Sequence, residues 1–125
     1  MSQSFVQFSS RKDNPSLEGV EDIDPKELLA LKANVVIIDV RKPDEFSGEL
    51  GHIAGAKMIV LDTLPDNMDQ IPKDKTIVFV CRSGNRSGRA TEFALEEGYE
   101  HVYNMAGGML RWNELGLPVE GRSGV

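Results

Sequence analysis

Two nearly uninterrupted apolar runs stand out along the chain, VVIIDV at 35–40 and TIVFV at 76–80. Runs rich in β-branched residues and of this length are typical of strands that are buried on both faces of a sheet. The segment 51–60 holds two glycines before an apolar stretch, which predicts a loop that leads into a short strand. The segment 101–105 predicts a further short strand. The pattern therefore places at least four strands along the chain.

Helix signals lie between and around these strands. In EDIDPKELLALKAN (21–34), Asp24 can cap a helix, Pro25 suits its first position and Glu27 completes a capping-box spacing. Helical patterns recur at 87–98 and at 107–116, each ending in a glycine. Strands that alternate with helices predict an α/β domain in three layers, with a mostly parallel sheet covered by helices on both faces.

The first 19 residues differ from the rest. They are rich in Ser, Gln, Asn and charged residues, and no repeat or low-complexity tract follows them. We expect a flexible N-terminal arm over 1–19 and one domain over 20–125. In an open parallel sheet, ligands bind beyond the carboxyl ends of the strands, so the segment after each predicted strand is a candidate site.

Composition narrows the class of protein. The chain has 125 residues, of which 40% are hydrophobic and 27% charged, as in an ordinary single globular domain. Its formal net charge of −6 disfavours general binding to nucleic acid or to an anionic membrane, because like charges repel. One cysteine and two distant histidines exclude an internal disulfide and predict no metal site. No apolar run has the length of a signal peptide or a membrane span, so we expect a cytoplasmic protein.

The single cysteine lies where the topology predicts chemistry. Cys81 follows the strand 76–80 directly and opens the loop CRSGNR, which leads into a helix. Gly84 permits a tight curl that turns successive backbone N–H groups inward, and Asn85 tolerates such a curl. These groups, Arg82 and Arg86 would hold Cys81 as a thiolate and attract an anionic substrate. The competing interpretation is that Cys81 is a small buried hydrophobic residue.

Phosphate chemistry is an alternative for a strand–Cys–loop–Arg–helix array. Cysteine phosphatases place five residues between the cysteine and the arginine, whereas four residues separate Cys81 from Arg86 here. A shorter loop makes a smaller ring of amides, which fits a small group on sulfur better than a phosphoryl group. Arsenate reduction on the same scaffold also stays open.

Three motifs in order resemble the rhodanese family of sulfurtransferases, in its single-domain bacterial form. They are IIDVRKPDEFSGELGHIAGA at 37–56, VFVCRSGNRS at 78–87 and NMAGGMLRWNELGLPV at 104–119. Together the resemblance spans roughly residues 20–119. It implies an α/β domain with a central five-stranded, mostly parallel sheet, and no metal or organic cofactor.

The resemblance also implies a reaction. Cys81 would take sulfane sulfur from thiosulfate or a related small anionic donor and pass the resulting persulfide sulfur to cyanide, a thiol or a sulfur-acceptor protein. It implies substrate binding by the loop and by one residue after the strand 35–40, namely Arg82, Ser83, Gly84, Asn85, Arg86 and Arg41. For Arg41 the alternative is pairing with Asp39, since buried charges are usually paired. A non-catalytic rhodanese-like binding module is the further alternative, and both a monomer and a homodimer are compatible with the sequence.

Overall fold

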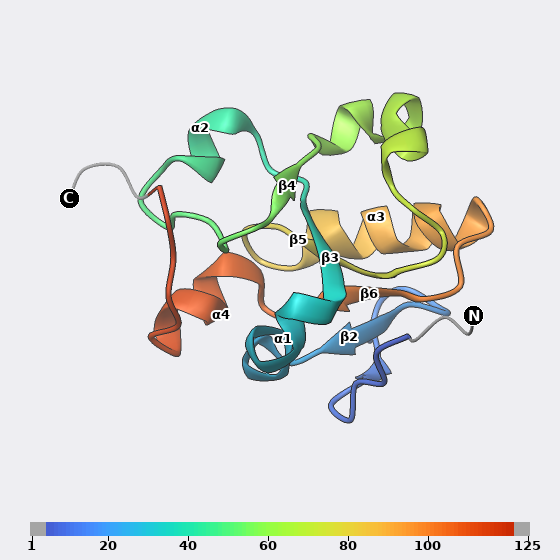
Figure 1. Cartoon of the computed structure of the whole chain (residues 1–125), viewed down its shortest axis with the longest axis horizontal. Coiled ribbons are helices and arrows are strands. Elements are labelled where there is room, and N and C mark those ends of the chain that lie inside the picture. Colours follow the sequence, from blue (N-terminus) through green and yellow to red (C-terminus); the bar gives the residue numbers. More distant parts are fainter. Residues whose placement is uncertain (1–4, 122–125) are drawn as a thin grey trace.

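The apolar runs form the centre of one sheet. The structure is a computed structural model that describes residues 5–121. Its six strands pair in the order β1-β2-β6-β5-β3-β4 (Figure 1). Their bounds are β1 Lys12–Asp13, β2 Glu21–Ile23, β3 Val35–Asp39, β4 Lys57–Met58, β5 Thr76–Val80 and β6 Val102–Met105. β1 runs antiparallel to β2, and every other pair is parallel.

The mostly parallel α/β fold predicted from the sequence is confirmed, with one more strand than the five expected. The extra strand is β1, which comes from the N-terminal arm and pairs at the outer side of β2 through Lys12 and Asp13. Both β1 residues are exposed, so no apolar pattern marks them as a strand in the sequence.

Helices cover both faces of the sheet. The α-helices are α1 Pro25–Leu31, α2 Pro43–Phe46, α3 Asn85–Glu96 and α4 Gly108–Glu114, and the 3₁₀ helices are η1 Lys32–Asn34 and η2 Leu61–Gln70. α3 contacts η2 on one side of the sheet and α1 contacts α4 on the other (Figure 1). None of the helices within residues 5–121 combines the length and apolar character needed to cross a bilayer.

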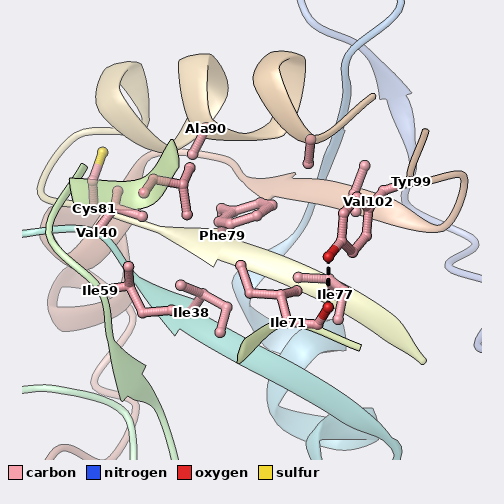
Figure 2. Close-up of a cluster of buried hydrophobic side chains, with 12 residues drawn as sticks. Ile38, Val40, Ile59, Ile71, Ile77, Phe79, Cys81, Ala90, Tyr99 and Val102 are labelled. Carbon is pink, nitrogen blue, oxygen red and sulfur yellow. Dashed lines mark hydrogen bonds between the residues drawn. The ribbon is translucent and has the colours of Figure 1, made fainter. Parts of the chain in front are cut away.

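The burial of β5 on both faces explains why its sequence is apolar after Thr76. All five of its residues are buried, and alternate side chains point to opposite faces. Ile77 and Phe79 pack in the core under α3 and η2, whereas Val78 and Val80 pack in the core with α1 and α4. This alternation fixes the direction of the next side chain in the series, Cys81, which joins the core on the α3 side (Figure 2).

The N-terminal arm is attached to the domain over its described part. Phe8 is fully buried in the α1/α4 core and contacts the Tyr103 ring edge-to-face, with ring centroids 5.1 Å apart. Glu27 does not complete the capping box. Its carboxylate instead accepts hydrogen bonds from the backbone N–H and the hydroxyl of both Ser9 and Ser10. Burial opposes ionisation of Glu27, but these hydrogen bonds outweigh it and lower its pKa to about 2.

Candidate active site

Cys81 lies at the carboxyl end of the central strand β5, where the topology predicted a ligand site. Its side chain is 1% exposed and faces the first turn of α3 (Figure 2). Strand β3 lies beside β5, and the backbone N–H of Val40 donates to the carbonyl of Val80. The sulfur is therefore placed by two of the best-buried strands of the sheet rather than by a mobile surface segment.

The loop after Cys81 curls back to the sulfur. Gly84 has a φ of +104°, a conformation that side chains disfavour, and its backbone N–H donates to Cys81 Sγ at 3.0 Å. Asn85, expected to share the curl, is instead the first residue of α3, and no residue other than glycine has a positive φ within residues 5–121. One glycine thus suffices to turn an amide onto the sulfur.

The start of α4 holds the loop from outside. The backbone N–H groups of Met109 and Leu110 donate to the carbonyls of Cys81 and Arg82, at 2.8 and 3.0 Å. These two carbonyls therefore point away from the sulfur, and two unpaired amides of the helix N-terminus are satisfied. The contact requires Gly108, where an added Cβ would lie 2.4 Å from the Arg82 oxygen and 2.5 Å from the Cys81 oxygen.

Ser87 is the second hydrogen-bond partner of the sulfur. Its hydroxyl lies 3.2 Å from Cys81 Sγ and also contacts Asn104 Oδ1, and its side chain is fully buried. The sequence pattern predicted a site role for neither Ser87 nor Asn104. The signal that could have found Ser87 is its position one helical turn beyond Gly84, on the face of α3 that meets the loop.

The Arg86 side chain is bound to Glu45. Its guanidinium binds the Glu45 carboxylate of α2 through two hydrogen bonds of 2.8 Å. This pairing lowers the pKa of Glu45 to about 2 and raises the pKa of Arg86 above its usual range. In this geometry the Arg86 side chain links α3 to α2 across the rim of the loop. Its predicted contact with substrate stays a prediction.

Arg41 is paired, as the alternative interpretation of the sequence had it. It is 1% exposed, and its Nε and Nη2 donate to the two Asp39 oxygens at 2.9 and 2.8 Å. Nη2 also donates to the Gly51 carbonyl and Nη1 to the Glu45 carbonyl. Four of its five N–H groups are used in this way. A direct role of Arg41 in substrate binding is untested. The observed role is to hold the segment that carries Glu45.

The remaining predicted residues lie on the outside of the loop. Arg82, Ser83 and Asn85 are exposed, and so is Arg89 on α3. A cavity of about 390 Å³ borders Ser83, Gly84 and Asn85 on one flank of the loop. A second cavity of about 320 Å³ borders Arg82 and Arg41 on the other flank. Within residues 5–121, no group of three or more His, Cys, Asp or Glu side chains is placed to bind a metal ion.

Several known proteins are similar to this chain in sequence. The family model described as "Rhodanese-like domain" matches residues 24–115. A sulfurtransferase of Allochromatium vinosum is 37% identical over 80% of this chain and 94% of its own. A thiosulfate sulfurtransferase GlpE of Tolumonas auensis is 33% identical over 66% of this chain and 76% of its own.

Several solved structures have a similar fold. A rhodanese-related protein of Thermoplasma volcanium superposes with a TM-score of 0.75 at 30% identity, covering 80% of this chain and 97% of that one. A protein of Rhodopseudomonas palustris, described as a possible tyrosine phosphatase, superposes with a TM-score of 0.72 at 29% identity, covering 81% and 85%. The family match spans most of the described chain and includes the Cys81 loop. The chain belongs to the rhodanese-like domain family.

Proposed function

We propose that this protein is a sulfurtransferase that carries sulfane sulfur on Cys81 as a persulfide. The observation that carries the proposal is the placement of Cys81 Sγ at the end of β5, with the Gly84 amide and the Ser87 hydroxyl as hydrogen-bond partners. A buried cysteine of the core needs no such partners, whereas a thiolate or a persulfide anion is stabilised by them. The sulfurtransferase relatives support the same class of reaction.

The reaction takes place in two displacements. The Cys81 thiolate attacks the outer sulfur of thiosulfate, a sulfur–sulfur bond to Cys81 forms, and the bond within thiosulfate breaks. Sulfite leaves with the bonding electron pair. A nucleophilic acceptor then attacks the outer sulfur of the persulfide and regenerates the thiolate, giving thiocyanate from cyanide or a new persulfide from a thiol. Covalent catalysis of this kind predicts ping-pong kinetics.

The loop residues have separate tasks in this reaction. The Gly84 amide stabilises negative charge on sulfur, and the N-terminus of α3, a helix of 12 residues, adds its dipole. The exposed Arg82 provides positive charge that attracts an anionic donor to a protein whose net charge is −6. The α4 start keeps the loop carbonyls away from the sulfur.

The acceptor is external. Cys81 is the one cysteine of the chain, so no second cysteine can take over its sulfur. We expect a small thiol or a thiol on a sulfur-acceptor protein in a reducing compartment such as the cytoplasm, where the thiolate is maintained. The protein acts as a monomer or a homodimer in this proposal, and no part of the reaction requires a cofactor.

A phosphatase is the second candidate because one structural neighbour is described as a possible tyrosine phosphatase. Two features weigh against it. The loop holds four residues between Cys81 and Arg86, which leaves fewer amides for three phosphoryl oxygens. The Arg86 guanidinium, which would hold a phosphoryl group, is bound to Glu45.

Steady-state assays separate these functions. We expect thiocyanate formation from thiosulfate and cyanide, with parallel lines in double-reciprocal plots, and no hydrolysis of an aryl phosphate. Cys81→Ser should form no thiocyanate. Phosphate release without thiocyanate formation would favour the phosphatase. If no sulfur is transferred from thiosulfate, mercaptopyruvate or glutathione persulfide and no phosphate is released, arsenate reduction and a non-catalytic binding module are the functions left to test.

A further inference from the structure

A series of hydrogen-bonded polar side chains, buried except for Asn14 at its outer end, leads from the N-terminal arm to Cys81. It is formed by Asn14, Asp22 on β2, Asn104 on β6, Ser87 on α3 and the sulfur. Asp22 is 8% exposed, Asn104 2% and Ser87 0%. Its five members come from the arm, β2, β6, α3 and the end of β5, and the sulfur-transfer steps above assign no role to Asn14, Asp22 or Asn104.

The direction of each hydrogen bond follows from the arm. Asn14 Oδ1 accepts the backbone N–H groups of Ser16 and Leu17, at 2.8 and 2.9 Å. Its Nδ2 therefore faces Asp22 and donates to Oδ1 at 3.0 Å. A carboxylate accepts hydrogen bonds and does not donate them, so the group that Asn104 presents to the same Asp22 oxygen, at 2.9 Å, is its Nδ2.

This orientation decides what Asn104 presents to Ser87. With Nδ2 directed at Asp22, Asn104 Oδ1 faces the Ser87 hydroxyl, which donates to it in a short hydrogen bond. A serine hydroxyl carries one proton. Two acceptors, Asn104 Oδ1 and a Cys81 thiolate, therefore compete for the same proton.

The two protonation states of Cys81 lead to different hydrogen bonds among Cys81, Ser87 and Asn104. While Cys81 is a thiol, its S–H can donate to Ser87 Oγ and the Ser87 proton can remain on Asn104 Oδ1, so every group has a partner. After ionisation, Ser87 must rotate to donate to the sulfur. Asn104 Oδ1, which is buried, then loses its donor, and a buried acceptor without a donor is costly.

We propose that Asn104, fixed by Asp22 and Asn14, is a positioning residue that competes with Cys81 for the Ser87 proton and so sets how readily the thiol ionises. The idea rests on the proposed function only in taking Cys81 as the reacting group. It assigns a role to a residue on β6 that does not touch the sulfur, and it connects the arm to the reaction.

Charged groups around Cys81 also influence its ionisation and are left unchanged by the test. Positive charge comes from the loop, from α3 and from the β3 edge, and negative charge comes from α2, β2 and the β3 edge. The groups concerned are Arg82, Arg86, Arg41, Glu45, Asp22 and Asp39.

The test is the ultraviolet titration of the thiolate, which is specific because Cys81 is the one cysteine and Cys81→Ser gives the background. Asn104→Leu removes the competing acceptor and should lower the titration midpoint by about one pH unit, the equivalent of one hydrogen bond. Ser87→Ala should raise the midpoint. In the Ser87→Ala background, Asn104→Leu should not change the midpoint further, because the Ser87 hydroxyl for which the two acceptors compete is absent.

Thr91→Val is the matched control. It removes another fully buried hydroxyl of α3, one turn beyond Ser87, which donates to the backbone carbonyl of Ser87 and to none of the side chains in the series. Its midpoint should equal that of the wild type. Asn104→Ala replaces Asn104→Leu if the leucine variant does not fold.

Two results would overturn the proposal. One is an unchanged midpoint in folded Asn104→Leu or Asn104→Ala. The other is a shift of equal size in the presence and absence of Ser87, which would show that Asn104 acts through Asp22 or through packing. The titration needs no sulfur donor, so its failure leaves sulfur transfer standing. Absence of sulfur transfer in the wild type leaves the titration interpretable.

Discussion

Replacing Gly108 by alanine tests whether the start of α4 holds the active loop in place. Gly108 has a φ of +58°, and an added Cβ would lie 2.4 Å from the Arg82 oxygen, against 3.4 Å for ordinary contact. The loop and α4 must therefore separate by about 1 Å. That movement would break the hydrogen bonds from Met109 and Leu110 to the loop carbonyls.

The magnitude follows from two contributions. An alanine in the left-handed region costs about 1 kcal/mol, and loss of the two hydrogen bonds costs about 1 kcal/mol each. We expect Gly108→Ala to lower the free energy of unfolding by about 3 kcal/mol. Displacement of the loop by about 1 Å should also slow sulfur loading of Cys81 by about 100-fold.

Gly116→Ala is the matched control. Gly116 has a φ of +72°, but a Cβ there would meet nothing within 4 Å. Backbone strain alone should lower the free energy of unfolding of Gly116→Ala by about 1 kcal/mol, and its rate of sulfur loading should not change. Urea unfolding and the loading rate, measured on both variants, decide the matter. Equal losses of stability and equal rates in the two variants would refute the role given to α4.

Three further predictions concern Glu45 beside the active loop and the attachment of the N-terminal arm. The first is tested by urea unfolding of Glu45→Gln and wild type between pH 7 and pH 3. Near neutral pH the free energy of unfolding of Glu45→Gln should be lower by about 1–2 kcal/mol. The full pKa shift would correspond to ~3.4 kcal/mol, and solvent screening reduces it. Because the Glu45 pKa is lowered from 4.5 to about 2, this stabilisation is complete above pH 4.5 and is lost as the pH falls through about 2. The difference from wild type should therefore narrow over that range, and a constant difference would contradict the ion pair with Arg86. Phe8→Ala should destabilise the protein by about 3–5 kcal/mol, whereas a freely flexible arm predicts almost no change in the same unfolding experiment. Glu27→Ala should release the arm and speed its cleavage in limited proteolysis, and an unchanged cleavage pattern would show that the bonds from Ser9 and Ser10 do not retain it.

The sequence was sufficient to predict the layers and the position of the nucleophile. The apolar runs became β3 and β5, and the cysteine after the second run lies at the carboxyl end of the sheet. Such features are local, because burial on both faces leaves its mark in consecutive residues. The capping role of Asp24 was predictable because it is also local: its carboxylate accepts from the Lys26 amide, two residues on.

Contacts between distant segments could not be predicted. Asn104 is 82 residues from Asp22 and 17 from Ser87, and as a single polar residue in a strand it carries no pattern. The Glu45 partner of Arg86 is 41 residues away on α2, so no local pattern marks this pairing in the sequence. These partners are brought together by the parallel arrangement of β2, β6, β5 and β3.

The central claim is that Cys81 carries the transferred sulfur. The most direct measurement is the mass of the intact protein after incubation with thiosulfate and again after addition of cyanide, with Cys81→Ser treated in parallel. We predict a gain of one sulfur atom in the wild type, its loss with cyanide, and no gain in the variant. Reversal by cyanide separates a persulfide from sulfinic acid, which has nearly the same mass and is not reversed in this way. A gain that persists with cyanide, or an equal gain in Cys81→Ser, would contradict the claim.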